Sequence, residues 1–413
     1  MSNETAKKGK KWETPLLDQL KEGPWPSFVR ELERCATTSP RTEDLLGQLE
    51  QSYKDNVNHW KHGGMAGVTG YGTGITARFS AMPEKFPGCK EYHTVRIGQT
   101  QGYFYTSEVL RKLADICDKY AGGLFDFHAS SGDIQTLGTR TDELDPMFAE
   151  LRKIHFDLGG GGSGVRTPSA CIGPARCEWA MFDTLRACQD FVEHYQDELH
   201  RPMFNYKWKT KFSGCPNDCD CSGVRSDLSF VGVWKDNIRI DQDAVKKYAE
   251  KMNIWEDVIY KCPTKCMSYD EKNGMVIDDS NCVKCMHCIN MMPKALRPGV
   301  VRGAQIRFGG KVTMTVGARL GFVLVPFYDI EKDKKEGYPF LTELLDRIWE
   351  FWDENGASRE RVGELIQRIG IGNFLEEIGL DPIPEMIAFP RQNPFIDFEE
   401  YYEEEGEEEE QEE

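Results

Sequence analysis

Apolar and polar positions in the first half of the chain predict strands and helices in turn. Glu91 to Ile97 alternates with a period of two, which indicates a strand. Val109 to Tyr120 repeats apolar residues at helical spacing, between a capping residue at Thr106 and a stop at Gly122. Leu124 to Ser130, LFDFHAS, reads as the next strand. The pattern is therefore a strand, a helix and a strand in succession.

The second half mixes the same two periodicities. Glu178 to Tyr195 has the spacing of an amphipathic helix, and residues 227–234, DLSFVGVW, have the apolar run of a buried strand. Strands resume at QIRF, VTMTV and GFVLVPF. Two amphipathic helices are predicted at Phe340 to Glu354 and at Ser358 to Glu377. This mixture predicts an α+β fold class.

The same pattern divides the chain into segments. Residues 1–60 form an arm with some helix, broken by a turn at Gly23 to Pro26. The remaining expected units are a half-domain at 61–165, an α/β domain at 166–235 and 301–335, a compact insert at 236–300, C-terminal helices at 336–396 and an acidic tail at 397–413.

Charge and composition exclude several classes of protein. The net charge of −17 falls to −5 without the tail, which carries twelve carboxylates. We expect that tail to be disordered, although contact with a partner is an alternative. The acidity argues against binding to nucleic acid. No apolar stretch resembles a secretory signal or a membrane span, so a cytoplasmic location is expected. There, fourteen cysteines favour metal ligation over disulfides.

Four of these cysteines form the clearest motif. Cys282, Cys285 and Cys288 have the CxxCxxC spacing with which ferredoxins wrap a [4Fe-4S] cluster, and Cys262, followed by proline, supplies a fourth thiolate. Zinc is the alternative, because four thiolates also suit it. Cys266 is a spare thiol that we interpret as structural. We call Cys262, Cys282, Cys285 and Cys288 the second cysteine set.

A first cysteine set precedes it in the chain, made of Cys171, Cys177, Cys215 and Cys219. Its CxxxxxC and CxxxC spacings favour a second cluster, with zinc or unrelated thiols as alternatives. The first two of these thiols come just before a predicted helix, whose N-terminal amides can donate to cluster sulfurs.

Basic residues flank the first cysteine set. In YKWKTKF, the strand period puts Lys207, Lys209 and Lys211 on one face. Such a row of ammonium groups is costly unless an anion lies among them, although a solvated edge strand would also explain it. Arg96 and Arg166 are placed to join them. The sequence therefore predicts an anionic site beside the first set.

These motifs together resemble a known family. The segments that carry the resemblance are LLGQLEQSYKDN, HTVRIGQTQGYFYTSEVLRKL, RTPSACIGPARCE, YKWKTKFSGCPNDC, CPTKC and CVKCMHCINMMPKAL. The chain resembles the alpha subunits of dissimilatory (bi)sulfite reductases, within the wider sulfite and nitrite reductase family. The resemblance covers nearly the whole chain except the acidic tail. An inserted ferredoxin module is much more specific to the dissimilatory branch than the first cysteine set is.

The resemblance implies cofactors and roles. The two cysteine sets would each hold a [4Fe-4S] cluster, and Cys219 would also be the axial ligand of a sirohaem iron, with Arg78 as a further cofactor-binding residue. Arg96, Arg166, Lys207 and Lys209 would bind sulfite, and the strand pattern adds Lys211. The inserted module would bring in electrons for the six-electron reduction of sulfite towards sulfide.

The resemblance also implies partners. A homologous beta subunit would complete an alpha2beta2 heterotetramer with sites shared across the interface, a membrane complex would donate electrons, and a small cysteine-tipped sulfur carrier protein would take up the product. Three alternatives stay open: the reverse, sulfur-oxidising direction; an assimilatory sulfite or nitrite reductase; and a structural or electron-transfer subunit whose own haem is inactive.

Overall fold

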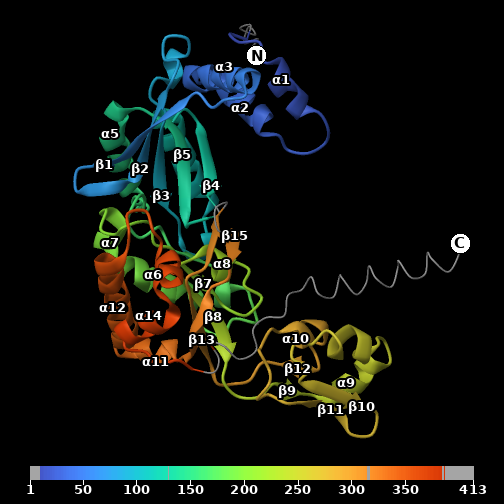
Figure 1. Cartoon of the computed structure of the whole chain (residues 1–413). Coiled ribbons are helices and arrows are strands. Elements are labelled where there is room, and N and C mark those ends of the chain that lie inside the picture. Colours follow the sequence, from blue (N-terminus) through green and yellow to red (C-terminus); the bar gives the residue numbers. More distant parts are fainter. Residues whose placement is uncertain (1–9, 129, 314–316, 384–385, 387–413) are drawn as a thin grey trace, which may run out of the picture.

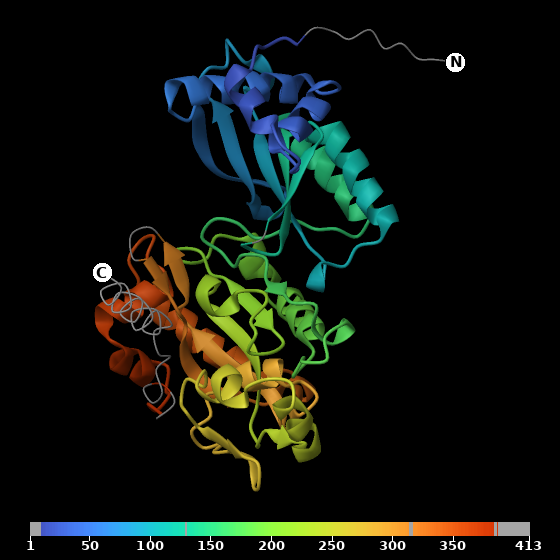
Figure 2. The same ribbon diagram turned by 90° about the vertical axis from the view of Figure 1, so that its right-hand side faces the viewer.

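The computed structural model describes residues 10–128, 130–313, 317–383 and 386. The expected disorder of the tail at 397–413 concerns residues outside this range. The chain forms two lobes, seen one above the other in Figure 2. One holds the N-terminal helices and a five-stranded sheet, and the other holds a second five-stranded sheet with the C-terminal helices (Figure 1). An insert with two small sheets extends from the second lobe.

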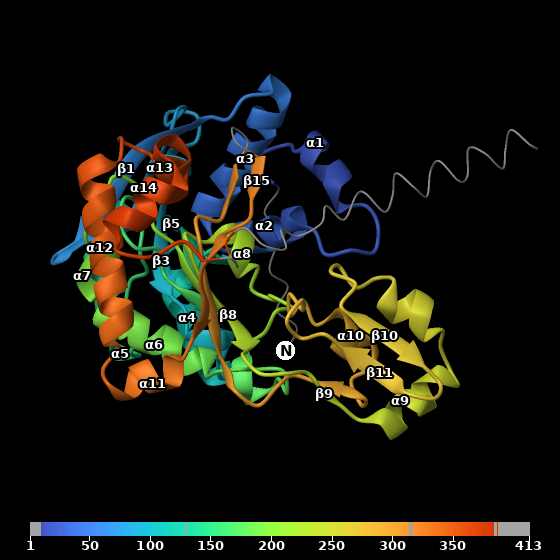
Figure 3. The same ribbon diagram turned by 60° about the horizontal axis from the view of Figure 1, so that its bottom comes forward.

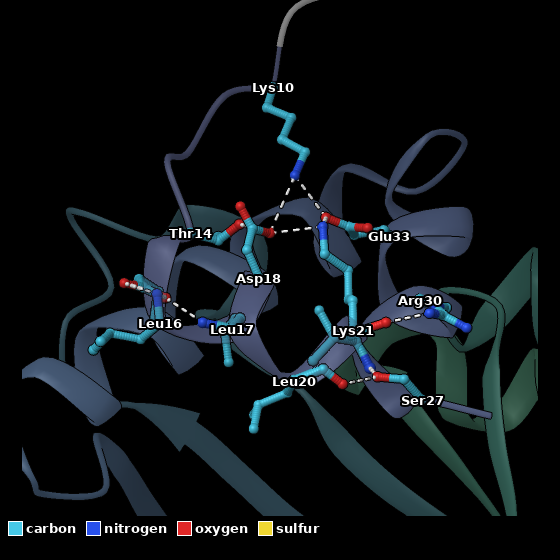
Figure 4. A network of polar contacts seen from close by, with 12 residues as sticks. Lys10, Thr14, Leu16, Leu17, Asp18, Leu20, Lys21, Ser27, Arg30 and Glu33 are labelled. Atoms are coloured by element: carbon cyan, nitrogen blue, oxygen red, sulfur yellow. Dashed lines mark hydrogen bonds and ion pairs between the residues drawn. The ribbon is translucent and has the colours of Figure 1, made fainter. Parts of the chain in front are cut away.

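The N-terminal arm folds into three helices, α1 (Pro15–Asp18), α2 (Phe28–Ala36) and α3 (Pro40–Asp55). A network of ion pairs ties α1 and α2 together (Figure 4). Lys21 lies 2.7 Å from Asp18 and 2.8 Å from Glu33, and Lys10 lies 2.6 Å from Glu33. Beneath it, Leu17, Val29 and Leu46 form a small buried cluster. The arm is therefore an ordered helical unit from residue 10 onward.

The first sheet has the strand order β1-β2-β3-β5-β4. Its strands are β1 (Trp60–Val68), β2 (Tyr71–Ser80), β3 (His93–Gly98), β4 (Leu124–His128) and β5 (Asp133–Thr139). Helices α4 (Ser107–Tyr120) and α5 (Leu144–Lys153) share its apolar core. The predicted cap is present, because Thr106 Oγ1 accepts a hydrogen bond from Val109 N over 3.2 Å.

The two faces of this sheet differ in polarity. The register pairs Val95 with Ile75, and these residues point into the core shared with α4 and α5. Because side chains alternate along a strand, the opposite face of β3 carries Arg96. Its partner across the ladder to β5 is Gln135, which faces Asp126 on β4. One face of the sheet is thus apolar, and the other presents charged and amide groups.

The second sheet has the order β16-β13-β8-β7-β6. Its strands are β6 (Ser169–Ala170), β7 (Thr210–Ser213), β8 (Leu228–Trp234), β13 (Arg302–Phe308) and β16 (Phe322–Tyr328), and β14 (Lys311–Thr313) pairs with β15 (Gly317–Arg319) beside it. The first three strands run parallel, and every residue of β8 is buried, as its apolar run predicts. Buried residues of α6 (Thr184–His194) and α12 (Pro339–Asn355) complete the core.

Two predicted helices have different bounds in the structure. The helix expected from Glu178 begins at Thr184, where Asp183 caps it by accepting a hydrogen bond from Arg186 N over 3.0 Å. The residues before the cap instead approach the loop after β7, because Met181 N donates to Gly214 O over 2.8 Å. The helix expected at 358–377 is two helices, α13 (Val362–Ile369) and α14 (Ile371–Glu377), since Gly370 adopts a φ of 91° between them.

The insert leaves the second sheet after β8 and returns to it at β13 (Figure 3). Its elements are β9 (Arg239–Ile240), α9 (Gln242–Ala249), a π-helix (Trp255–Ile259), β10 (Met267–Asp270), β11 (Gly274–Ile277), α10 (His287–Met291) and β12 (Leu296–Arg297). Short helices α7 (Gln196–His200), α8 (Ser222–Arg225) and α11 (Ile330–Lys335) connect the strands of the main body. Among the described residues, no helix has the length and apolar character needed to cross a bilayer.

Candidate iron-sulfur and anion-binding site

The first cysteine set is assembled at the ends of two parallel strands. Cys171 directly follows β6, and Cys215 follows β7 by one residue. Gly214 N donates to Cys171 Sγ over 3.2 Å, and Asn217 Nδ2 donates to Cys215 Sγ over 3.6 Å. Amide donors to sulfur stabilise the charged, metal-bound form of a thiolate. The backbone around these cysteines is thus arranged for ligation.

The four thiols of this set lie close enough to influence one another. Burial and then the charges of Cys177 and Cys219 raise the pKa of Cys215 to about 11, against the opposing hydrogen bonds from Asn217. The pKa of Cys219 is also raised, first by burial and then by Cys171 and Cys177. Thiolates that repel each other in this way are stabilised by bound cationic iron. The structure therefore brings together the whole first set.

Asp218 organises the loop between Cys215 and Cys219, and sequence reasoning missed it. Its carboxylate accepts hydrogen bonds from Ser213 Oγ over 2.6 Å, Ser222 N over 2.7 Å and Gly223 N over 3.0 Å. Asp218 itself has a φ of 47°, a left-handed conformation that Asp tolerates better than most residues. Its position inside CPNDC is the signal that could have pointed to a turn-forming role.

The second cysteine set surrounds one cavity in the insert. All four predicted ligands line it, together with Cys266, which we interpreted from the sequence as structural. Cys266 Sγ lies 3.6 Å from Cys262 Sγ, because the turn at Pro263 folds the chain back on itself. Five thiols therefore face this cavity. Within the described residues, no three His, Cys, Asp or Glu side chains are grouped to hold a single metal ion.

Arg96 comes from the first sheet, whereas Arg166 N donates to Trp208 O over 2.8 Å and so lies beside the second sheet. Arg96 Nη1 donates to the fully buried carboxylate of Asp133 over 2.7 Å. Ser131 Oγ also donates to this carboxylate, over 2.5 Å, so Asp133 is fixed from a second side. Burial and then the nearby charge of Arg96 lower the pKa of Arg166 to about 10. The two guanidinium groups therefore lie close together in a poorly solvated setting.

Lys207 and Lys209 complete a cationic group. Burial, followed by the charges of Arg361 and Arg166, lowers the pKa of Lys209 to about 7. The Lys209 ammonium donates to Ser130 O over 2.9 Å. Burial likewise lowers the pKa of Lys207, whose ammonium lies 4.9 Å from the Tyr206 ring centroid. We call Arg96, Arg166, Lys207 and Lys209 the cationic group.

Lys211 and Arg78 are placed differently from this group. The Lys211 side chain is only 2% exposed, and its ammonium pairs with Asp220, 3.0 Å from the carbonyl and 3.3 Å from the carboxylate. Its charge is therefore balanced inside the protein. Arg78 lies on β2 of the first sheet, and its carbonyl accepts a hydrogen bond over 3.0 Å from the N of Tyr92, the residue just before β3. Both stay predictions as site residues.

Three charged residues near the cationic group were missed from the sequence. Arg361, at the start of α13, donates to Asp227 over 2.8 and 2.6 Å, and both side chains are almost fully buried. Asp227 Oδ2 also accepts from Lys209 N over 2.8 Å. Burial and then the charge of Arg96 lower the pKa of His128, at the end of β4. Sequence analysis could not find these residues, because they lie between positions 128 and 361 and form no local motif.

The residues present fit an anionic group rich in carboxylate or oxyanion oxygens. Arg96 Nε, Arg166 Nε and Gln135 Nε2 are buried and have no hydrogen-bond partner among the described residues. Buried donors in native proteins are normally paired, so such atoms need an acceptor that the described residues do not supply. The carboxylates of a sirohaem and the oxygens of sulfite are acceptors of this kind.

Comparison with known protein families agrees with this geometry. Residues 161–383 match the family described as the nitrite and sulphite reductase 4Fe-4S domain, and residues 87–154 match the nitrite/sulfite reductase ferredoxin-like half domain. The first match contains both cysteine sets and most of the cationic group. The second contains Arg96.

Individual relatives show to which group within the family the chain is similar. The chain is 44% identical to the dissimilatory-type sulfite reductase alpha subunit of Nitratidesulfovibrio vulgaris, over 94% of each chain. It is 26% identical to the beta subunit of Archaeoglobus fulgidus, over 70% of this chain and 79% of that one. A crystal structure of dissimilatory sulfite reductase I superimposes with a TM-score of 0.86 at 43% identity, covering 93% of this chain and 94% of that one. The chain therefore belongs to the nitrite and sulphite reductase family, in its group of dissimilatory-type alpha subunits.

Proposed function

We propose that this chain is the alpha subunit of a dissimilatory sulfite reductase, which reduces sulfite by six electrons towards sulfide. The observation that carries the proposal is the cationic group, in which Arg96 Nε and Arg166 Nε are buried and have no hydrogen-bond partner among the described residues. A small oxyanion is the ligand that this charge and these unpaired donors favour.

Each cysteine set has a proposed occupant. Cys171, Cys177, Cys215 and Cys219 would hold one [4Fe-4S] cluster, and Cys262, Cys282, Cys285 and Cys288 would hold the other. Cys219 and Arg78 would contact a sirohaem, which supplies the redox-active iron for multielectron reduction when bound. The second set would serve as the electron entry, since it sits in an insert whose buried core also includes Met181 and Cys215 of the main body.

The side chains of this chain supply charge and protons. Arg96 and Arg166 would neutralise sulfite, and Asp133 holds Arg96 in position for this role. Lys209, with its pKa near 7, exists partly as an ammonium and partly as an amine at neutral pH, so it can give a proton to a sulfite oxygen and regain it. Lys207 adds a second proton donor beside it. Protonation at the oxygens allows them to leave as water.

The proposal includes an assembly and a location. A homologous beta subunit would pair with this chain in a heterotetramer, with the polar face of the first sheet towards the shared site. A low-potential donor, such as a membrane complex, would deliver electrons to the insert, and a small cysteine-tipped carrier protein would receive the reduced sulfur. The reducing cytoplasm suits a chain that depends on free thiols.

Lysine replacement in the purified complex tests the function. Lys207→Ala with Lys209→Ala should lower kcat/KM for sulfite by roughly a hundredfold or more, since positioned proton donors contribute about 10² to 10⁴. Lys272→Ala, on an exposed turn of the insert, is the matched control and should leave kcat/KM unchanged. Unchanged kinetics in the double variant would contradict the role of the cationic group.

Pigment analysis tests the cofactors independently. Acid extraction of the complex and of the isolated chain should yield a sirohaem-type pigment from at least the complex, and iron analysis should give two clusters per chain. If neither preparation yields such a pigment, the chain is an electron-transfer or structural protein and the catalytic proposal fails.

A further inference from the structure

Two asparagine side chains meet between the two cysteine sets. Asn290 Nδ2 donates to Asn217 Oδ1 over 2.6 Å, and Asn217 Nδ2 faces Asn290 Oδ1 at 3.5 Å. Each asparagine follows a cysteine by two residues, Asn217 after Cys215 and Asn290 after Cys288. Asn217 Nδ2 also donates to Cys215 Sγ over 3.6 Å. This amide pair therefore joins the loop of the first set directly to the helix of the second.

Hydrogen bonds of the backbone fix the segments that carry Asn217 and Asn290. Asn290 lies on α10, where its N donates to Met286 O over 2.8 Å. Asn217 precedes Asp218, whose N donates to Cys215 O over 3.1 Å and whose carboxylate fixes the rest of the loop. The contact thus joins two exposed side chains whose backbone segments are each held by hydrogen bonds.

A second contact holds the insert in place independently of the amide pair. Arg297 lies 2.6 Å from Glu178, which directly follows Cys177, and its guanidinium stacks 4.7 Å from the Trp179 ring centroid. Met181 also packs in the same buried cluster as the insert core. The amide pair therefore completes a continuous path of covalent and hydrogen bonds between the two sets, whereas the contacts of Arg297 fix the position of the insert.

We propose that the Asn217–Asn290 amide pair is the electron-transfer bridge from the second cysteine set to the first. Electron tunnelling weakens less steeply along covalent and hydrogen bonds than across open gaps. The path leaves Cys288, follows the backbone to Asn290, crosses the 2.6 Å hydrogen bond and reaches Cys215 through Asn217. One electron crosses at a time: the insert cluster is oxidised by one electron, the cluster on the first set is reduced by one, and no proton is transferred.

This inference rests on the proposed function, because it requires a cluster on each cysteine set. The proposed function and the electron-transfer bridge can be disproved separately. Iron content and the visible spectrum of the purified complex report whether both clusters are present. The rate of electron transfer between them reports on the bridge alone.

The test uses Asn290→Leu in the complete complex, since leucine keeps the branched shape of the side chain and removes both hydrogen bonds. Asn290 contacts no thiol in the hydrogen bonds of the described residues, so the potentials of both clusters should stay unchanged. A photoreduced viologen, a one-electron donor, reduces the insert cluster in a flash, and rapid-freeze electron paramagnetic resonance follows arrival of the electron at the first set. We expect about a tenfold slower transfer, because a gap replaces the hydrogen-bonded link.

Arg297→Gln is the matched control, because it weakens the other contact between the insert and the first set. It should leave the transfer rate close to that of the unchanged complex. If both variants slow transfer equally, the amide pair only docks the insert and the bridge is disproved. A normal rate in Asn290→Leu with both clusters loaded overturns it as well, whereas loss of clusters from the unchanged complex overturns the proposed function.

Discussion

The two cysteine sets are built in opposite ways. The second set is local: its four predicted ligands and Cys266 lie within 27 residues of one another and surround one cavity in the insert. The first set combines two loops that are 38 residues apart, at Cys177 and Cys215, on adjacent parallel strands. Its cationic neighbours come from still further away, from Arg96 on β3 to Arg361 on α13.

The difference lies also in electrostatics. In the cationic group, buried cations lower the pKa of one another, and two buried carboxylates, Asp133 and Asp227, hold Arg96 and Arg361 in place. The insert has no comparable group of buried cations among its described residues. An arrangement of like charges with unpaired donors suits binding and reaction of an anion, whereas a thiol-lined cavity in a small core suits storage of an electron.

The largest expected effect comes from breaking the second set. Cys285→Ser should remove the insert cluster, halve the cluster iron per chain and abolish sulfite reduction by a donor that enters through the insert, while the first set keeps its cluster. Iron analysis and electron paramagnetic resonance of the complex measure both effects.

Cys266→Ser tests which thiol is the fourth ligand of the insert cluster. If Cys262 is the fourth ligand, as we predict, Cys266→Ser should retain the full iron content. Loss of the insert cluster in Cys266→Ser, with retention in Cys262→Ser, would show that the fifth thiol is the ligand and that the predicted set is wrong at one position.

Breaking the buried ion pair beside the cationic group should have the next largest effect. Asp227→Ala leaves the Arg361 guanidinium buried without its partner, and loss of one member of such a pair costs about 3–5 kcal/mol in free energy of unfolding. Chemical denaturation of the complex measures this. Asp353→Ala, on an exposed position of α12, is the control and should change stability by less than about 0.5 kcal/mol. Equal stability of the two variants would mean that the pair is dispensable.

The sequence predicts the local features well. The helix at α4 with its Thr106 cap, the buried strand β8 and the thiols of both sets are where the pattern indicates, because spacing and periodicity act over few residues. The helix predicted from Glu178 begins late, because tertiary contact of Met181 with Gly214 outweighs its helical periodicity. A left-handed glycine at 370 divides another predicted helix.

The partners of the cations could not be predicted, for a physical reason. Asp133 and Asp227 are single acidic residues without a distinctive neighbour pattern. The register of β3 and β5 brings Asp133 to Arg96, and the packing of the start of α13 beside β8 brings Asp227 to Arg361. The strand period put Lys211 on the same face as Lys209, but it could not show that Asp220 balances the charge of Lys211. Pairing of buried charges depends on tertiary geometry.

A smaller effect is expected from the carboxylate that positions Arg96. Asp133→Asn keeps the shape of the side chain but weakens a charge-assisted hydrogen bond, which contributes about 1.5–3 kcal/mol. The freed guanidinium should bind sulfite less well, so KM should rise about tenfold with a smaller change in kcat. Steady-state kinetics measure the split, with Asp115→Asn on the exposed side of α4 as the control. An unchanged KM would show that Arg96 is positioned by other contacts.

The smallest expected effect is a shift in pH dependence. Because the pKa of Lys209 is lowered to about 7, activity that needs its ammonium should fall as the pH rises through about 7. Lys209→Arg cannot lose its proton in this range, so any fall that it retains belongs to sulfite or to another group. The double variant Asp227→Asn with Arg361→Gln removes one charge of each sign. Since Arg361 lowers the Lys209 pKa more than Asp227 raises it, the falling limb of the activity profile should move to higher pH by less than about one unit.

The lowered pKa of Lys209 also fixes how stability depends on pH. Between about 7 and the usual lysine pKa of 10.5, the folded chain binds fewer protons at Lys209 than the unfolded chain. Stability should therefore rise with pH across that window in the unchanged complex and not in Lys209→Arg. A limb that stays in place in the double variant would show that burial alone sets the pKa of Lys209, and a stability that falls with pH would contradict the lowered pKa itself.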